Sequence, residues 1–227
     1  MAQFLALLGD LPISTENEEL VIRMFMACGL WGPGGWPNTA VHCAKVAQVA
    51  MELCKLAELP ISAVENVVFA GLVHDARKSF EKAQIAQLTS GGMSKDDAYT
   101  AAACTQATWL IEFGIPDHIV GLSGLSGHTS LGGFYPELPD SLPAMAFHVA
   151  DDLCGGQYGD ELVMLHDRMA QLRERYDWLS NTREELGGRS WIDVQAEVAD
   201  QIMDAFATQT VFQTGEALNR WLVRYFN

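Results

Sequence analysis

Segments with the apolar spacing of α-helices, each bounded by capping or stop signals, follow one another along this chain of 227 residues. Ser94 with Asp97 forms the capping pattern that opens one of these segments. Gly114 and Pro116 close the same segment, as is typical of a helix C-terminus. The alternation of apolar and polar residues that indicates a half-buried strand is almost absent. The sequence therefore predicts an all-α fold.

Further capping patterns predict where other helices begin. Thr15 with Glu18 forms one, and Ser62 with Glu65 forms another. Pro and Gly residues separate the helical segments. The expected elements are helices over 15–30, 39–58, 62–74, 94–113, 116–128, 141–156, 191–211 and 215–226 and, within 160–190, a charged amphipathic helix followed by a turn near 187–188.

The composition is that of a globular protein, with 49% hydrophobic and 19% charged residues and a mean hydropathy of +0.07. No apolar run approaches the roughly 18 residues that a membrane helix needs. The apolar start MAQFLALLGDLP lacks a basic region and carries Asp10, so we expect no signal peptide. We therefore expect a cytoplasmic protein that does not contact a membrane.

The formal net charge of −15 would repel nucleic acid backbones and anionic membranes, so we expect neither as a partner. Against such a surface, a local group of cations is informative. Four of them, Lys45, Arg77, Lys78 and Lys82, lie close in sequence to the first two histidines. This grouping indicates that a phosphate could bind near those histidines.

The stretch FAGLVHDARKSF, residues 69–80, ends an apolar helical run with His74 and Asp75. Three more histidines, His42, His128 and His148, lie in apolar helical settings or at helix ends. Imidazole nitrogen and carboxylate oxygen together suit Mn, Fe, Co or Zn, and helix packing can bring such residues together. A mixed site of this kind leaves positions for water and substrate oxygens, as metal-assisted hydrolysis requires. A hydrogen-bonded network without metal is the alternative.

The order of these residues resembles the pattern of the HD-domain superfamily of metal-dependent phosphohydrolases. That pattern has a histidine on one helix, a His-Asp pair ending a second helix and an Ala-Asp pair on a later helix. The matching residues are His42, the pair His74-Asp75, and Asp151 in the segment HVADDL. Lys78 completes the sequence H-D-x-x-K.

The segment IPDHIVGLSGLSGHTS, which contains His128, resembles the family segment in which a helix ends in a histidine. The resemblance covers about residues 36–156. It implies a single all-α domain over 1–227, in which an HD-domain-like helical bundle forms the core. A C-terminal helical extension over 157–227 is expected to pack on this core.

The resemblance also implies roles for individual residues. The metal ligands would be His42, His74, Asp75 and Asp151, and they would hold one divalent transition metal (Mn, Fe, Co, Ni or Zn) per chain. Lys78 matches the position that often approaches the scissile phosphate. The implied function is the cleavage of a phosphomonoester or phosphoanhydride of a small molecule by a metal-activated water, with a nucleotide as the favoured substrate class.

The chemistry of such a reaction suggests further roles. Lys78, together with Arg77 or Lys45, would bind the substrate and offset charge on its phosphoryl oxygens. Asp75 would orient or deprotonate the attacking water with the oxygen that is not bound to the metal. His128 would contact the substrate, donate a proton or bind a second metal weakly. We therefore expect Asp75, Lys78 and His128 to be catalytic residues.

Alternatives stay open at this point. Some HD-fold proteins bind two irons and oxidise substrates with oxygen, but the segment DDAYTAAACTQATWL lacks the extra histidine of a dinuclear set. A ligand-binding HD protein without catalysis is a third hypothesis. Asp152 competes with Asp151 as the ligand, because adjacent residues point about 100° apart on a helix. His148 is expected to be a packed core histidine, and a homodimer is left open.

Overall fold

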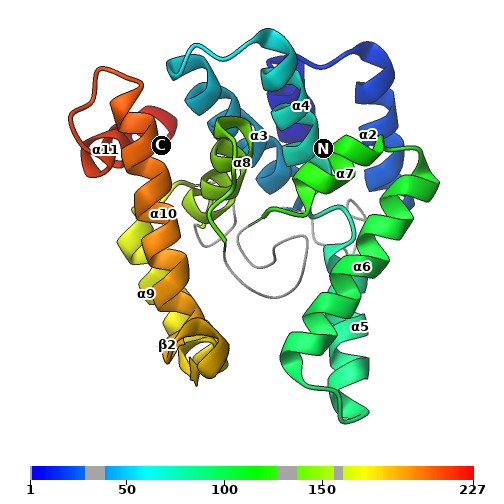
Figure 1. Ribbon diagram of the computed structural model, residues 1–227. Helices are drawn as coiled ribbons and strands as arrows, with labels where there is room; N and C mark the ends of the chain where they lie inside the picture. Colours follow the sequence, from blue (N-terminus) through cyan, green and yellow to red (C-terminus); the bar gives the residue numbers. More distant parts are fainter. Residues whose placement is uncertain (1, 29–38, 127–136, 156–160) are drawn as a thin grey trace.

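The computed structural model describes residues 2–28, 39–126, 137–155 and 161–227. Within these ranges it contains eleven α-helices and one two-stranded sheet, which confirms the predicted all-α fold (Figure 1). The elements are α1 (Ala2–Gly9), α2 (Thr15–Ala27), α3 (Thr39–Leu56), α4 (Ile61–Val73), α5 (Lys78–Ser90), α6 (Lys95–Phe113), α7 (Asp117–Ser123), α8 (Leu142–Leu153), α9 (Leu165–Arg175), the 3-10 helix η1 (Asp177–Ser180), β1 (Thr182–Arg183), the 3-10 helix η2 (Glu184–Leu186), β2 (Arg189–Ser190), α10 (Trp191–Thr208) and α11 (Gly215–Phe226). Among the described residues, no helix has both the length and the apolarity that crossing a membrane requires.

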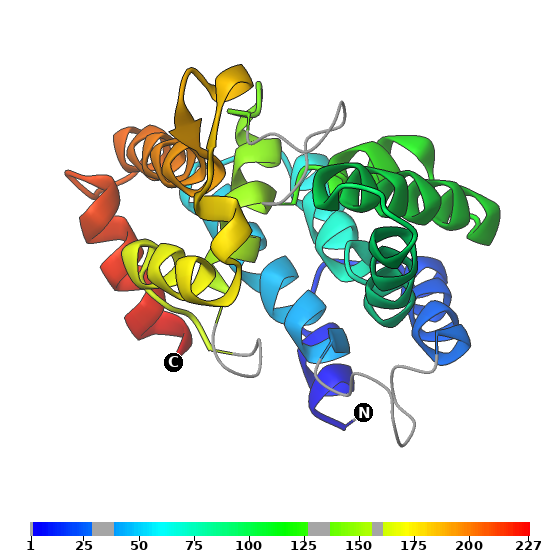
Figure 2. The same ribbon diagram turned by 90° about the horizontal axis from the view of Figure 1, so that it is seen from below.

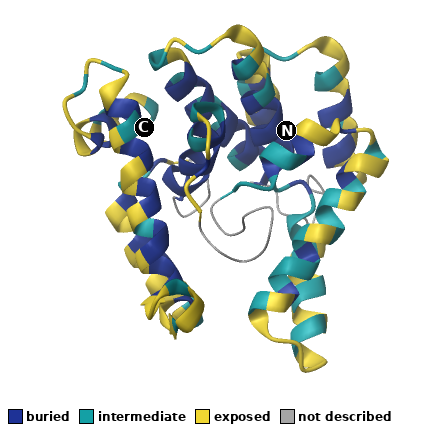
Figure 3. Cartoon of the chain, in the orientation of Figure 1, coloured by how far each residue is buried: buried dark blue, intermediate teal, exposed yellow. Residues whose placement is uncertain are grey.

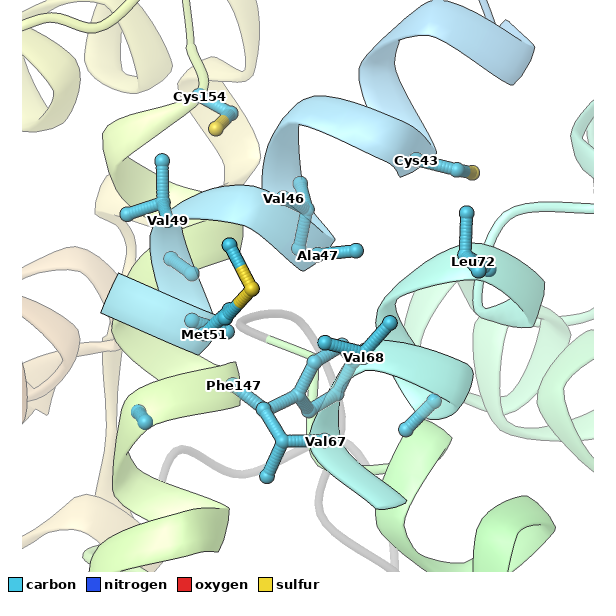
Figure 4. Packing of buried hydrophobic residues seen from close by; sticks show 14 of the residues in the cluster. Cys43, Val46, Ala47, Val49, Met51, Val67, Val68, Leu72, Phe147 and Cys154 are labelled. Atoms are coloured by element: carbon cyan, nitrogen blue, oxygen red, sulfur yellow. The ribbon is translucent and has the colours of Figure 1, made fainter. Parts of the chain in front are cut away.

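Two helices, α3 and α4, form the centre of the molecule. All residues of α4 from Val67 to Val73 are buried, as expected for a helix that is apolar on every side. Helix α3 packs most extensively against α4 and then against α8. Figure 4 shows Phe147 of α8 in the same cluster as Val68 of α4 and Val46 of α3. Buried residues gather in this central region, and the outer helix faces are exposed (Figure 3).

Two helical pairs extend from this core on opposite sides (Figures 1 and 2). The α5–α6 arm comprises Lys78–Phe113, and the α9–α10 arm comprises Leu165–Thr208 with the small sheet at its tip. An ion pair between Arg183 of β1 and Asp96 of α6 connects the two arms. The arms therefore touch through side chains, although they leave the core at different places.

The small sheet of the α9–α10 arm is absent from the elements predicted for the chain. Its strands β1 and β2 are antiparallel, with Thr182 opposite Ser190. Gly187 and Gly188 have positive φ angles of 66° and 79°, which glycine adopts without strain, and they form the turn that the sequence predicts. Strands of two residues are too short to show an alternating pattern.

Helix starts agree with the predicted capping patterns in one case and differ in two. The hydroxyl of Ser94 caps α6 as predicted. At α2 the capping side chain is Ser14 rather than Thr15. Helix α4 begins directly after Pro60 and has no side-chain cap, so Ser62 does not act as one. Helix α5 is not among the predicted elements, and none of its residues is buried.

Helices α3 and α4 approach each other closely at Gly71. A β-carbon on Gly71 would lie 2.9 Å from the Cα of Ala47 and 3.0 Å from its backbone nitrogen. These distances are shorter than real contacts, so only glycine permits the approach. The contact brings the start of α3 and the end of α4 to the same place.

Gly71→Ala should destabilise the fold by about 1–3 kcal/mol, because the added methyl group forces α3 and α4 apart. Gly121→Ala in α7 is a matched control, since a β-carbon there would meet nothing within 4 Å and alanine favours a helix. Chemical denaturation of both variants measures the free energy of unfolding. A Gly71→Ala protein as stable as the wild type would contradict the close contact.

Candidate metal centre

Three core helices meet at one point, and each brings a side chain that can bind a metal. His42 lies in the first turn of α3, His74 ends α4, and Asp151 lies in the last turn of α8. Their potential ligand atoms all lie within 4.8 Å of one another. These residues form a His-His-Asp cluster that could hold a metal ion.

The distances within the cluster suit a small divalent ion. Asp151 Oδ1 lies 3.2 Å from His42 Nε2 and 3.4 Å from His74 Nε2. Metal bonds of about 2.1 Å, at angles between octahedral and tetrahedral, separate neighbouring ligand atoms by about 3.0–3.5 Å. Asp151 therefore already lies at the distance from each histidine that a common metal ion imposes on neighbouring ligands.

His74 is oriented for metal binding by its own helix. Its Nδ1 donates a hydrogen bond of 2.7 Å to the carbonyl oxygen of Gly71, which leaves the lone pair on Nε2. The Nε2 atom is buried and makes no hydrogen bond with the described residues. Its nearest carboxylate oxygen is Asp151 Oδ1 at 3.4 Å, and a metal ion could be bound by both atoms.

Asp75 and Lys78 lie beside the cluster. Asp75 Oδ2 is 3.9 Å from His42 Nε2 and 4.0 Å from His74 Nε2. Asp75 Oδ1 accepts a hydrogen bond of 3.1 Å from Lys78 Nζ, and Lys78 also pairs with Glu81 at 3.2 Å. The structure thus brings Asp75, a predicted ligand, to the edge of the cluster, and it places Lys78 directly next to Asp75.

Burial and charge act in opposite directions in the cluster. Burial disfavours the ionised form of Asp151, but the hydrogen bond with His42 and the close contact with His74 hold its pKa well below the usual value. Burial also disfavours the charged form of His74, yet contacts with Cys43 and Asp75 raise its pKa well above the usual value. Without a metal, the raised pKa favours a second proton on the His74 ring, which would replace the Nε2 lone pair that a metal needs.

Asp75 and Lys78 stabilise each other's charged forms. Burial would raise the pKa of Asp75, but Lys78 and His74 lower it below the usual value. Burial would lower the pKa of Lys78, but Asp75 and Glu81 raise it well above the usual value. At neutral pH, Lys78 is therefore a cation held beside a carboxylate.

A cavity of about 440 Å³ lies over the cluster, and both arms contribute to its walls. Its polar lining from the arms includes Lys78, Lys82, Tyr99 and Gln106 on the α5–α6 arm and Arg168 and Arg175 on the α9–α10 arm. Gln106 also donates a hydrogen bond to the carbonyl oxygen of His74, which connects α6 to the end of α4. The cluster therefore lies in a cavity where a small molecule could reach it.

Two residues expected to bind substrate lie elsewhere, and this expectation is corrected. Lys45 Nζ donates a hydrogen bond of 3.2 Å to the carbonyl oxygen of Phe226, at the end of α11. Arg77 donates a hydrogen bond of 3.4 Å to the carbonyl oxygen of Thr105, and its guanidinium lies 5.6 Å from the ring centroid of Trp109. Neither Lys45 nor Arg77 is among the described residues that line the cavity. Their charges connect helices of the fold instead.

Of the remaining candidate residues, the structure describes His148 and Asp152 but not His128. His128 lies outside the described residues, so its roles stay predictions. His148 is buried and its Nε2 lies 3.0 Å from the amide nitrogen of Gln195, as expected for a packed core histidine. Asp152 accepts a hydrogen bond from the same amide. Asp152 therefore points to α10, whereas Asp151 faces the two histidines.

Arg168 and Arg175 are cavity residues that the sequence does not single out. They lie seven positions apart on α9 and so occupy the same face of that helix. This spacing is visible within the predicted charged helix. Whether that face meets solvent or the cavity depends on how α9 packs against the core, which no local pattern encodes.

Comparison with known proteins gives no match. No protein-family model matches the chain, and no curated protein and no solved structure matches it either. Function is therefore inferred from the geometry and chemistry of the cluster and its cavity.

Asp151→Asn should lose most of the bound metal, because a neutral amide replaces the carboxylate that faces both histidines. Asp152→Asn is a matched control on the adjacent position. Asp152 accepts a hydrogen bond from the amide of Gln195 and does not face the two histidines, so its replacement should leave the cluster intact. Elemental analysis of both purified variants measures metal per chain. Equal metal content in the two variants would exclude Asp151 as a ligand.

Metal binding at pH 7 should release about one proton, because His74 is protonated in the metal-free protein and must be neutral to bind a metal. Metal affinity should consequently rise with pH until the raised pKa of His74 is passed. Titration calorimetry in buffers of different ionisation enthalpy counts the released protons. Binding without proton release would contradict a protonated His74 in the metal-free protein.

Proposed function

We propose that this chain is a metal-dependent phosphohydrolase of the HD-domain type, which cleaves a phosphomonoester or phosphoanhydride of a small molecule. The observation that carries the proposal is the position of Lys78. Its ammonium group lines the same cavity as the His-His-Asp cluster and is fixed beside Asp75. Phosphoryl transfer needs such a cation next to a metal site, because charge on the phosphoryl oxygens must be offset.

The cluster residues have the chemistry to hold a divalent transition metal. His42 and His74 would bind through nitrogen and Asp151 through oxygen, with Asp75 Oδ2 as the nearest additional ligand. When bound, the ion would polarise a phosphoryl oxygen and lower the pKa of a water molecule. The hydrogen bond from His74 Nδ1 to Gly71 fixes the ring so that only Nε2 faces the ion.

Lys78 and Asp75 would have different roles in the reaction. Lys78 keeps its charge, and 29% of its side chain is exposed, so it can bind an oxygen of the transferred phosphoryl group. Asp75 is better suited to bind the metal or to orient the water than to accept a proton. Its pKa is lowered, and Lys78 already occupies its Oδ1 atom. Of the two roles that the sequence suggests for Asp75, these facts favour orienting the attacking water over deprotonating it.

The cavity supports a small substrate. Its volume of about 440 Å³ falls in the range of small-molecule sites, roughly 300–1,000 Å³. Tyr99 and Tyr176 also line it and offer aromatic faces, which is compatible with the nucleotide expected as the favoured class. The substrate would reach a cationic cavity on a chain whose overall charge is −15.

Metal content separates this proposal from its two rivals. Protein purified without chelator and without air should contain about one Mn, Fe, Co, Ni or Zn ion per chain. Two irons per chain would instead indicate an oxygenase. Absence of metal, even after reconstitution with each ion, would favour a binding protein without catalysis.

Lys78→Gln should keep the metal but lower kcat/KM for phosphate esters on the order of 10²- to 10³-fold, because it removes a cation that offsets transition-state charge. Lys45→Gln is the control, since Lys45 contacts α11 outside the cavity and should leave kcat/KM unchanged. Steady-state kinetics on a panel of phosphomonoesters and phosphoanhydrides gives both values. Unchanged kinetics in Lys78→Gln would remove Lys78 from the mechanism.

A further inference from the structure

A second group of cations lines the cavity on the side of the α9–α10 arm. Arg168 and Arg175 project from one face of α9, and Lys82 lies on the opposing helix α5. None of them is a candidate metal ligand, and none is the cation held beside Asp75. The cavity therefore has positive charge in two places, one at Lys78 and one on α9.

Arg168 reaches the cavity across Gly155, which follows α8. A β-carbon on Gly155 would lie 2.5 Å from Arg168 Cδ and 2.8 Å from its Nε, so the glycine leaves room for the arginine. Arg168 Nε is buried and makes no hydrogen bond with the described residues. In the part of the chain that the structure describes, Arg168 also forms no ion pair. Arg168 lies close enough to the buried Asp152 to lower the pKa of that carboxyl, but no described residue accepts a hydrogen bond from its Nε, so a ligand could provide the acceptor.

The charges of the cavity support an anionic ligand larger than one phosphoryl group. Four cationic side chains line it, against the three carboxylates Asp75, Glu81 and Asp151. Lys78 is paired with two of these carboxylates, and a divalent ion would add two positive charges. Burial and the nearby charges of Lys78 and Arg175 lower the pKa of Lys82, which reflects the crowding of cations. A single phosphoryl group carries only about two negative charges.

We propose that the substrate carries a second phosphoryl group, which Arg168 and Arg175 bind on the α9 side of the cavity while the first is cleaved beside Lys78. This inference rests on the proposed function for the identity of the cleaved group. Arginine suits the role because its planar guanidinium can donate two parallel hydrogen bonds to one phosphate. The C-terminal part of the chain would thus select the substrate, and the core would cleave it.

Binding of non-hydrolysable phosphonates to metal-loaded protein tests the inference without turnover. The probes are propane-1,3-bisphosphonate, with two phosphonate groups, and propylphosphonate, with one. The wild type should bind the bisphosphonate on the order of tenfold or more tightly, because charge-assisted hydrogen bonds to the second group are added. Arg168→Gln should remove most of this preference and leave propylphosphonate binding and metal content unchanged. Titration calorimetry measures the affinities.

Arg173→Gln is the matched control, because Arg173 lies on the same helix but forms an exposed ion pair with Asp193. It should retain the wild-type preference, and it also controls for chelation of the metal by the bisphosphonate. Gly155→Ala is a second route to the same result, since the new β-carbon displaces Arg168 without removing its charge. This variant should lose the preference as well, with a thermal melt that shows an intact fold.

Two results would overturn the inference. One is a wild type that binds both probes equally; the other is an Arg168→Gln variant that weakens both by the same factor. 3-Phosphonopropionate, which carries a carboxylate in place of the second phosphonate, should bind more weakly than the bisphosphonate. Equal binding would overturn the assignment of a phosphoryl group. If no phosphate ester is hydrolysed but the Arg168-dependent preference persists, the proposed function fails and the anion site stands.

Discussion

The close contact between α3 and α4 determines where the metal centre can form. Gly71 allows the backbone of α4 to approach Ala47, and the first turn of α3 then lies beside the last residue of α4. The carbonyl oxygen of the same Gly71 receives the hydrogen bond that orients His74. One small residue thus sets both the separation of the two helices and the direction of a ligand. Asp151 completes the cluster because α8 packs on both helices.

Electrostatics explains why positive charge gathers around this cluster. Asp151 and Asp75 are held as carboxylates in a largely buried place, where unpaired charge is costly. In the metal-free state, the proton on His74 and the ammonium group of Lys78 offset that charge. A divalent ion would replace the proton, and Lys78 could then bind an oxygen of the substrate. The same groups therefore stabilise the fold without metal and prepare the site for one.

Sequence inference predicts the residues of this site mainly through the resemblance to the HD-domain pattern. That resemblance implies His42, His74 and Asp151 as ligands, and the structure brings these three side chains together. Lys45 and Arg77 show its limit, since proximity in sequence to a ligand does not determine where a long side chain points. Lys45 contacts the end of α11 and Arg77 contacts α6, and both contacts arise from tertiary packing. Tertiary packing also explains why the sequence does not predict the cavity-lining arginines of α9. The sequence of α9 is typical of a charged surface helix.

Asp151 and Asp152 show how one helix can serve two purposes. Adjacent positions on a helix point about 100° apart, so the two carboxyl groups meet different surroundings. Asp151 is charged and faces the histidines, whereas burial raises the pKa of Asp152, which accepts a hydrogen bond from Gln195 of α10. Helix α8 therefore contributes Asp151 to the candidate metal centre with one face and contacts α10 of the α9–α10 arm with the next. Because that arm carries Arg168, the position of a substrate's second anionic group would be fixed relative to the metal by neighbouring residues of a single helix.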